Sequence, residues 1–213
     1  MTPFDPAWPR PRRAVAEARR ALPAELGTVL DFWFGAPEAE DYGANRPPWF
    51  AKDDAFDRAI RDRFAALHER LQDGAMAELV VDPDAALALI VALDQFPRNM
   101  FRGSPRMYAS DERARALATA AVGAGIDRLL VPVERWFVYL PLEHSERLDD
   151  QERALGLIGD LAWHEPSRKA FESAGRHHAI VARFGRFPHR NAVLGRASTA
   201  EEEAFLMMPG SSF

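Results

Sequence analysis

Near the middle of the chain, an unbroken apolar run, Ala85-Ala86-Leu87-Ala88-Leu89-Ile90-Val91-Ala92-Leu93, leads straight into Asp94-Gln95-Phe96-Pro97-Arg98-Asn99. A helix that is apolar on every face has no side to turn towards water, so other helices must cover it. The run therefore predicts a central, buried helix over residues 82–96. Asp94 follows Ile90 and Val91 by one helical turn, which places its carboxylate on the buried side of this helix.

Helices are expected on both sides of the central one, because apolar residues recur at spacings of three and four. We expect them over residues 10–22, 25–34, 53–71, 110–123, 133–140, 149–163, 166–184 and 199–207. Pro141 is expected to interrupt the helix that begins near Val133. The sequence has no sustained alternation with a period of two and no Asn-Gly or Asp-Gly hairpin turn. It predicts an all-α protein of about nine helices, with residues 1–9 as a disordered tail and residues 10–213 as a single domain.

Composition limits the classes of partner. The chain has 213 residues, 47% of them hydrophobic and 28% charged, which is ordinary for a soluble globular protein. Its net charge of −5 gives no overall attraction to nucleic acid or to an anionic membrane, so neither is predicted as a partner. Any attraction to an anion has to be local. A homodimer is compatible with the chain's size, although no motif demonstrates one.

The absence of cysteine excludes disulfides, thiolate catalysis and cysteine-ligated metal centres. No apolar run approaches the length of about 20 residues that a membrane-spanning helix needs. The segment Met1–Arg13 lacks the apolar core of a secretory signal. A cytoplasmic location is therefore expected.

Two segments repeat the order Phe-Pro, basic residue and asparagine, at residues 94–104 and 183–191. Proline restricts the backbone and glycine frees it, so such segments aim their side chains more than a solvated charge run does. We expect the two segments to be walls of one positively charged site that binds a small anion, a carboxylate or a phosphate. Its candidate binding residues are Arg98, Asn99, Arg102, Arg183, Arg186, His189, Arg190 and Asn191.

Four residues are candidates for acid–base chemistry: Asp94, His144, Glu146 and His177. Asp94 lies in the last turn of a buried helix, where the helix dipole disfavours its charge, so it needs a partner such as Arg98 or Arg102. His144 follows Leu140 by four residues, and His177 shares a stripe with Ile180 and Val181. Both imidazoles therefore point inward, where each is either a general base or a hydrogen-bonded core histidine.

Structural and metal interpretations compete with this one. Glu143, Glu146 and Asp94 could neutralise the arginines in a buried network that fixes helix packing. His144, Glu146, His177 and Asp94 are metal ligands by type, but they lack a tight ligand spacing. A Ser-His-Asp triad through Ser104 or Ser145 lacks a nucleophile-elbow sequence. The sequence therefore predicts neither a metal nor another cofactor.

Four motifs of the chain resemble the bacterial domain-of-unknown-function family 924. They are Leu30-Asp31-Phe32-Trp33-Phe34-Gly35, Leu93–Asn99, Tyr139–Glu146 and Arg183–Asn191 with Leu194–Thr199. The resemblance covers about Leu26 to Leu206 and implies a tetratricopeptide-like α–α superhelix, with no established reaction. The family's histidine before the arginine-rich segment maps onto His177. Where the family tends to have an acid two residues later, this chain has Ala179, which weakens any mechanism that needs a carboxylate there.

Two functions follow from these patterns. The first is an enzyme or binding protein for a small anionic metabolite, held by the arginines with His144 or His177 as acid or base. The second is an interaction module in which a helical array binds a protein or peptide along its concave face, and the polar motifs are structural.

Overall fold

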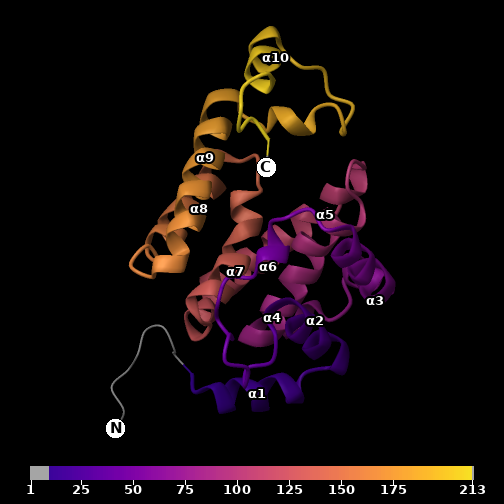
Figure 1. Ribbon diagram of the computed structural model, residues 1–213, viewed down its shortest axis with the longest axis vertical. Helices are drawn as coiled ribbons and strands as arrows, with labels where there is room; N and C mark the ends of the chain where they lie inside the picture. Colours follow the sequence, from indigo (N-terminus) through magenta and orange to yellow (C-terminus); the bar gives the residue numbers. More distant parts are fainter. Residues whose placement is uncertain (1–9, 213) are drawn as a thin grey trace.

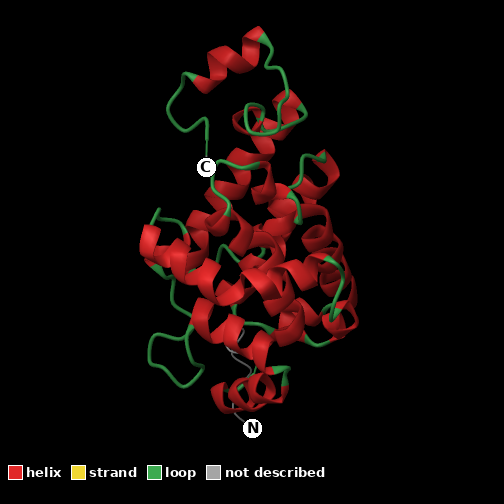
Figure 2. Cartoon of the chain, turned by 90° about the vertical axis from the view of Figure 1, so that its right-hand side faces the viewer, coloured by secondary structure: helices red, strands yellow, loops and turns green. Residues whose placement is uncertain are grey.

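The computed structural model describes residues 10–212, and this part of the chain contains helices and loops but no strand (Figures 1 and 2). The all-α prediction is confirmed. The α-helices are α1 (Arg12–Ala21), α2 (Ala24–Phe34), α3 (Asp54–Gln72), α4 (Pro83–Ile90), α5 (Phe96–Met100), α6 (Asp111–Ala124), α7 (Pro132–Glu143), α8 (Leu148–Gly159), α9 (Arg168–Phe184) and α10 (Ala200–Leu206).

Short 3₁₀ helices lie between them, and one π-helical turn, η3 (Val91–Gln95), joins α4 to α5. The 3₁₀ helices are η1 (Pro47–Trp49), η2 (Ala77–Val81), η4 (Pro105–Tyr108), η5 (Ile126–Leu129), η6 (Glu165–Ser167) and η7 (Pro188–Arg190). Because α4, η3 and α5 follow without a break, the described residues form nine separate helices, as expected.

The central helix begins where Asp82 accepts a hydrogen bond from the backbone of Ala85 at 2.8 Å. It was expected to end at Phe96, and that boundary is wrong, since the helix continues through Pro97 to Met100. The reason is the π-helical turn, in which the Phe96 N–H donates to the Val91 carbonyl, five residues back. The wider turn makes room for a proline that would disrupt an ordinary α-helix.

Side chains from other helices satisfy the carbonyls that the π-helical turn leaves without their usual donors. The Ala92 carbonyl accepts from His68 Nδ1 at 3.0 Å. Pro97 has no N–H for the Leu93 carbonyl, which instead accepts from Ser110 Oγ at 2.6 Å. Ser110 directly precedes α6, but its side chain bonds to the central helix and makes no cap hydrogen bond to α6.

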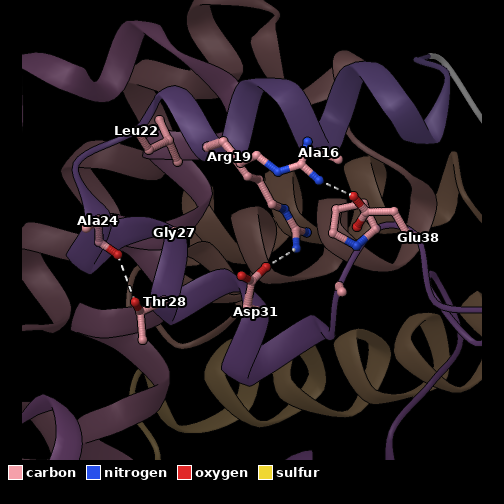
Figure 3. A pocket seen from close by; sticks show the side chains of 11 residues that line it. Ala16, Arg19, Leu22, Ala24, Gly27, Thr28, Asp31 and Glu38 are labelled. Carbon is pink, nitrogen blue, oxygen red and sulfur yellow. Dashed lines mark hydrogen bonds and ion pairs between the residues drawn. The ribbon is translucent and has the colours of Figure 1, made fainter.

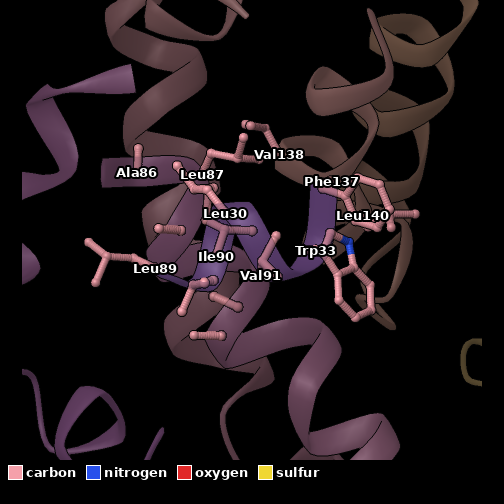
Figure 4. Packing of buried hydrophobic residues seen from close by; sticks show 14 of the residues in the cluster. Leu30, Trp33, Ala86, Leu87, Leu89, Ile90, Val91, Phe137, Val138 and Leu140 are labelled. Carbon is pink, nitrogen blue, oxygen red and sulfur yellow. The ribbon is translucent and has the colours of Figure 1, made fainter. Parts of the chain in front are cut away.

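The main core forms around this helix (Figure 4). Leu87, Ile90 and Val91 of the central helix are fully buried, and Trp33 of α2 and Phe137 of α7 pack nearby. The two aromatic rings meet edge to face, with centroids 5.7 Å apart. Each such side chain stabilises the fold by roughly 1.5–3 kcal/mol when it is fully buried. The predicted burial of the central helix is confirmed.

A second, smaller apolar cluster holds the C-terminal part together, in the upper part of Figure 1. Ile180 and Val181 of α9 pack with Phe187, and Phe184 and Phe205 lie against them. Thr199 caps α10, and Glu202 returns a hydrogen bond to the Thr199 backbone. This cluster places η7, which follows α9, near the end of α7.

Several sequence expectations change. Pro141 does not interrupt α7, which runs from Pro132 to Glu143, and α8 ends at Gly159, short of residue 163. The predicted disordered tail, residues 1–9, lies outside the described residues. The tetratricopeptide-like superhelix and the single-domain boundary stay predictions. Among residues 10–212, no helix combines the length and the apolar character that crossing a membrane requires.

Candidate functional site

The π-helical turn brings Asp94 to the C-terminal end of α7. Nδ1 of His144, the residue that follows α7, lies 2.8 Å from Oδ1 of Asp94. Gln95 Nε2 donates to Oδ2 of the same carboxylate at 2.6 Å, and Arg98 Nη1 lies 3.4 Å from Oδ1. Asp94 is completely buried, so these contacts replace the water that its charge has lost. Of the two arginines considered as its partner, Arg98 is the one in contact.

The surroundings fix the charge of both groups. Burial alone would raise the pKa of Asp94, but the Arg98 charge and the contact with His144 outweigh it and lower this pKa to about 2. Burial and the Arg98 charge lower the pKa of His144 below its usual range, against the opposing effect of Asp94. Near neutral pH, His144 is therefore neutral and donates its Nδ1 proton to an ionised Asp94, which leaves a lone pair on Nε2.

Two arginines share a carboxylate beside this pair. Arg98 donates to both oxygens of Asp111 at 3.0 and 3.1 Å, and Arg190 Nη1 lies 3.7 Å from Oδ2 of Asp111. The Tyr108 ring faces both guanidinium groups, at 5.8 Å from that of Arg98 and 4.7 Å from that of Arg190. Residues on η4, α5, α6 and η7 thus meet in one place.

Arg190 is buried, yet its guanidinium has few hydrogen-bond or ion-pair partners. Its side chain is 8% exposed, it lies over the Phe187 ring at 4.4 Å, and its Nε has no hydrogen-bond partner. Among residues 10–212 its guanidinium makes an ion pair only with Asp111, beyond hydrogen-bond distance. Burial and the nearby Arg98 charge lower its pKa. A guanidinium is usually buried with its donors paired, so this one lacks acceptors.

A second histidine–carboxylate pair lies next to the first. Nδ1 of His177, on α9, is 2.9 Å from Oε1 of Glu143 and 3.0 Å from the Ser173 carbonyl. Ser173 Oγ donates to the same Glu143 oxygen at 3.1 Å. The His144 and His177 rings are 6.2 Å apart, and the Phe187 ring meets that of His177 edge to face at 5.4 Å.

These contacts join into a closed circuit of seven side chains, here called the polar ring: Asp94, His144, His177, Phe187, Arg190, Asp111 and Arg98. Water reaches part of it, since the side chains of His144, Arg98 and Asp111 are 13%, 16% and 21% exposed. His189 lies beside Phe187 at 5.6 Å. Its burial and the Arg190 charge lower its pKa to about 4.

Four of the predicted binding residues point elsewhere. Asn99 Nδ2 donates to Asp57 at 2.7 Å, and Arg102 Nε donates to the same carboxylate at 2.5 Å. On the C-terminal side, Arg183 Nε donates to Glu201 at 2.9 Å, and Arg186 donates to both oxygens of Glu202 at 2.6 and 2.7 Å. Carboxylates of the chain itself occupy these side chains.

Glu146 and Asn191 fasten the C-terminal segment instead of entering the polar ring. Glu146 accepts two hydrogen bonds from Arg196, at 2.6 and 2.9 Å, and one from the Phe187 backbone at 2.8 Å. Asn191 accepts from Arg196 at 3.0 Å and donates to Ser198 at 3.1 Å. Together these bonds hold η7, and with it Arg190, against the end of α7.

Sequence reasoning missed Tyr108 and Asp111 as members of this neighbourhood. Neither residue lies in the two Phe-Pro segments or among the four acid–base candidates from which the site was predicted. Glu143 was considered as a counter-charge for the arginines, and it is a histidine partner instead. Within residues 10–212, no group of three or more histidine, aspartate or glutamate side chains is placed to hold a metal ion.

Two cavities share no lining residue with the polar ring. One, of about 360 Å³, lies between α1 and α2 (Figure 3), where Arg19 already contacts Asp31, the Gly35 carbonyl and Glu134. The other, of about 600 Å³, lies between η2 and α6. In the first cavity, carboxylates pair with both lining arginines, Arg19 and Arg20, and the second is lined by a single arginine, Arg113. We therefore favour the polar ring on chemical grounds.

The fold and the polar ring define an all-α protein whose histidine–carboxylate pairs meet where the central helix, α7 and η7 come together. The family model described as a bacterial protein of unknown function (DUF924) matches residues 29–210, and the chain belongs to this family. The structure is also similar to a solved protein of unknown function from Agrobacterium tumefaciens. The two are 39% identical with a TM-score of 0.73, over 86% of this chain and 97% of that one. No curated protein matches the chain.

Proposed function

We propose that the polar ring binds a small anionic metabolite, with Arg190 as its main cationic contact and His144 as a general base. The observation that carries the proposal is the state of Arg190. It is a buried guanidinium whose Nε has no partner and whose ion pair with Asp111 spans 3.7 Å. An anion beside it would supply the acceptors that the chain does not.

The charges around Arg190 support this assignment. Asp111 is divided between two arginines and bonds closely only to Arg98, so it neutralises Arg190 incompletely. Guanidinium groups suit carboxylates and phosphates because their planar array of N–H groups matches two oxygens at once. Each such charge-assisted hydrogen bond stabilises a complex by about 1.5–3 kcal/mol.

His144 adds the means to move a proton. Asp94 fixes the tautomer that carries its proton on Nδ1, as the carboxylate of a catalytic His–Asp pair does. Nε2 makes no hydrogen bond with any residue between 10 and 212. It can therefore take a proton from a bound substrate or from a water molecule next to it.

The test is isothermal titration calorimetry of the wild-type protein with inorganic phosphate and with acetate at low ionic strength, where salt screens least. Arg190→Gln should weaken binding at least tenfold, or about 1.4 kcal/mol. Arg183→Gln is the matched control, because Arg183 is 53% exposed and paired with Glu201. It should bind as the wild type does.

The outcome that rejects the proposal is equally direct. If neither anion binds the wild type, or if Arg190→Gln binds as tightly as Arg183→Gln, the polar ring is not an anion site. Thermal unfolding of both variants separates lost binding from a lost fold. Arg190→Lys adds a second check, because it keeps the charge but loses the planar fork, and intermediate binding is expected of it.

A further inference from the structure

The His144 imidazole of the polar ring presents an acceptor. Nδ1 of His144 lies 2.8 Å from the buried Asp94 carboxylate, and Nδ1 of His177 lies 2.9 Å from the Glu143 carboxylate. An ionised carboxylate only accepts hydrogen bonds, so the neutral His144 imidazole carries its proton on Nδ1. The Nε2 atom of His144 then holds a lone pair. The polar ring thus combines a guanidinium that needs acceptors with one imidazole nitrogen, Nε2 of His144, that needs a donor.

From this combination we infer that the ligand carries a proton on an anionic oxygen, as a hydrogenphosphate group does: its ionised oxygens face Arg190, and its P–OH donates to Nε2 of His144. This inference rests on the function proposed above and specifies the ligand for the same site. The lowered pKa of His144 supports it, since a neutral ring accepts whereas a protonated one donates.

Other anions fit less well. Sulfate has the shape of phosphate but has no proton near neutral pH, so its oxygens would face the lone pair of Nε2 without a hydrogen bond. Acetate has two oxygens in one plane, which one guanidinium fork satisfies, and it too brings no proton. A buried acceptor left without a donor weakens binding, because it loses its hydrogen bonds to water and gains none. Phosphate should therefore bind at least about tenfold more tightly than sulfate.

The structure of the site also keeps His144 available for this role. Its ring is 13% exposed, so a small ligand can approach it from solvent. The ring of its neighbour His177 lies 6.2 Å away between ring centres. Arg98 is occupied by Asp111, so the cation facing the ligand is Arg190.

The experiment compares inorganic phosphate, methyl phosphate and sulfate by calorimetry on the full-length protein. The two phosphates distinguish free phosphate from a phosphate monoester as the source of the group. The key variant is His144→Asn, and His178→Asn is the matched control, since His178 lies on α9 outside the polar ring. In the wild type and in His178→Asn, one of the phosphates should bind at least about tenfold more tightly than sulfate. In His144→Asn, this preference should fall to about twofold or less.

Each result decides a separate point. Sulfate that binds as tightly as both phosphates overturns the hydrogenphosphate inference and leaves the proposed anion site intact. If none of the three ions binds, and acetate does not either, both proposals fail. A phosphate preference that persists in His144→Asn overturns the role of His144. Nitrogen-15 NMR of the wild-type histidines needs no variant: the His144 Nε2 resonance should move with phosphate and stay in place with sulfate.

Discussion

Nδ1 of His144 lies 2.8 Å from Oδ1 of Asp94, although the two residues are fifty positions apart in the chain. The contact joins the end of α7 to the π-helical turn of the central helix. Asp94 has no exposed surface, so its charge depends on His144, Gln95 and Arg98. The pair therefore links the packing of the core to the chemistry of the polar ring.

Replacing Asp94 tests this link. The Asp94 charge raises the pKa of His144 against burial and the Arg98 charge, so Asp94→Asn should lower that pKa further. The measurement is an NMR titration of the His144 ring. Asp149→Asn, at an exposed carboxylate paired with Arg147, should leave the His144 titration unchanged. A rise of the His144 pKa in Asp94→Asn would show that Asp94 does not stabilise the charged ring.

His189 predicts how stability depends on pH. Its pKa in the fold is lowered from 6.5 to about 4, so the unfolded chain takes up this proton first as the pH falls below 6.5. The native state then loses stability between pH 6.5 and pH 4, by a free energy on the order of 3 kcal/mol. Urea unfolding across this range should show the loss, and His189→Gln should reduce its slope. A His189→Gln profile as steep as that of the wild type contradicts the assignment.

Replacing Ser110 tests how much its hydrogen bond to the π-helical turn contributes to the free energy of unfolding. Ser110→Ala leaves the buried Leu93 carbonyl without the donor that Pro97 cannot supply, which should lower the free energy of unfolding by about 1–3 kcal/mol. Thr28→Ala is the matched control, because it also removes a hydroxyl that donates to a backbone carbonyl, but at an exposed position. That change should cost less than about 0.5 kcal/mol. Equal losses in urea unfolding would mean that the Leu93 carbonyl finds another donor.

Local sequence was sufficient for the core and for one half of the site. The apolar run at residues 85–93 predicts a buried helix, and the spacing of Asp94 from Ile90 places the carboxylate on the buried face of that helix. The spacing of His144 from Leu140 likewise predicts an inward ring. What the spacing does not contain is the partner of each group. That choice depends on which helix ends meet, and these contacts join residues fifty positions apart.

The arginines illustrate the limit most clearly. A π-helical turn changes the direction of every side chain after it, so a regular helical period does not tell whether Arg98 or Arg102 faces Asp94. In the C-terminal copy, Arg186 and Arg190 look equivalent by type. Their contacts differ because α10 begins with acidic residues. Glu202 of α10 accepts a hydrogen bond from Arg186, whereas Arg190 lies in the polar ring next to Asp111.

Glu146 and Arg196 predict how firmly η7 is held in place. They form a bidentate pair at 2.6 and 2.9 Å, with side chains 26% and 25% exposed. Arg183 and Glu201 make the matched exposed pair, at 53% and 63%. A double-mutant cycle with glutamine should give a coupling free energy of about 1–2 kcal/mol for the first pair. For the second it should be below about 1 kcal/mol, because water screens exposed charges.

Two single variants from this cycle, Glu146→Gln and Glu201→Gln, also test whether the C-terminal segment positions Arg190 for phosphate binding. Glu146 also accepts from the Phe187 backbone, and Phe187 lies under the Arg190 guanidinium. Glu146→Gln should therefore weaken phosphate binding several-fold, although Glu146 lies outside the polar ring, and Glu201→Gln should not. One outcome is that the cycle gives the expected coupling free energy between Glu146 and Arg196 while Glu146→Gln leaves the phosphate affinity unchanged. The C-terminal segment then supports the fold without positioning Arg190. A loss of both ties the anion site to the docking of η7 against α7.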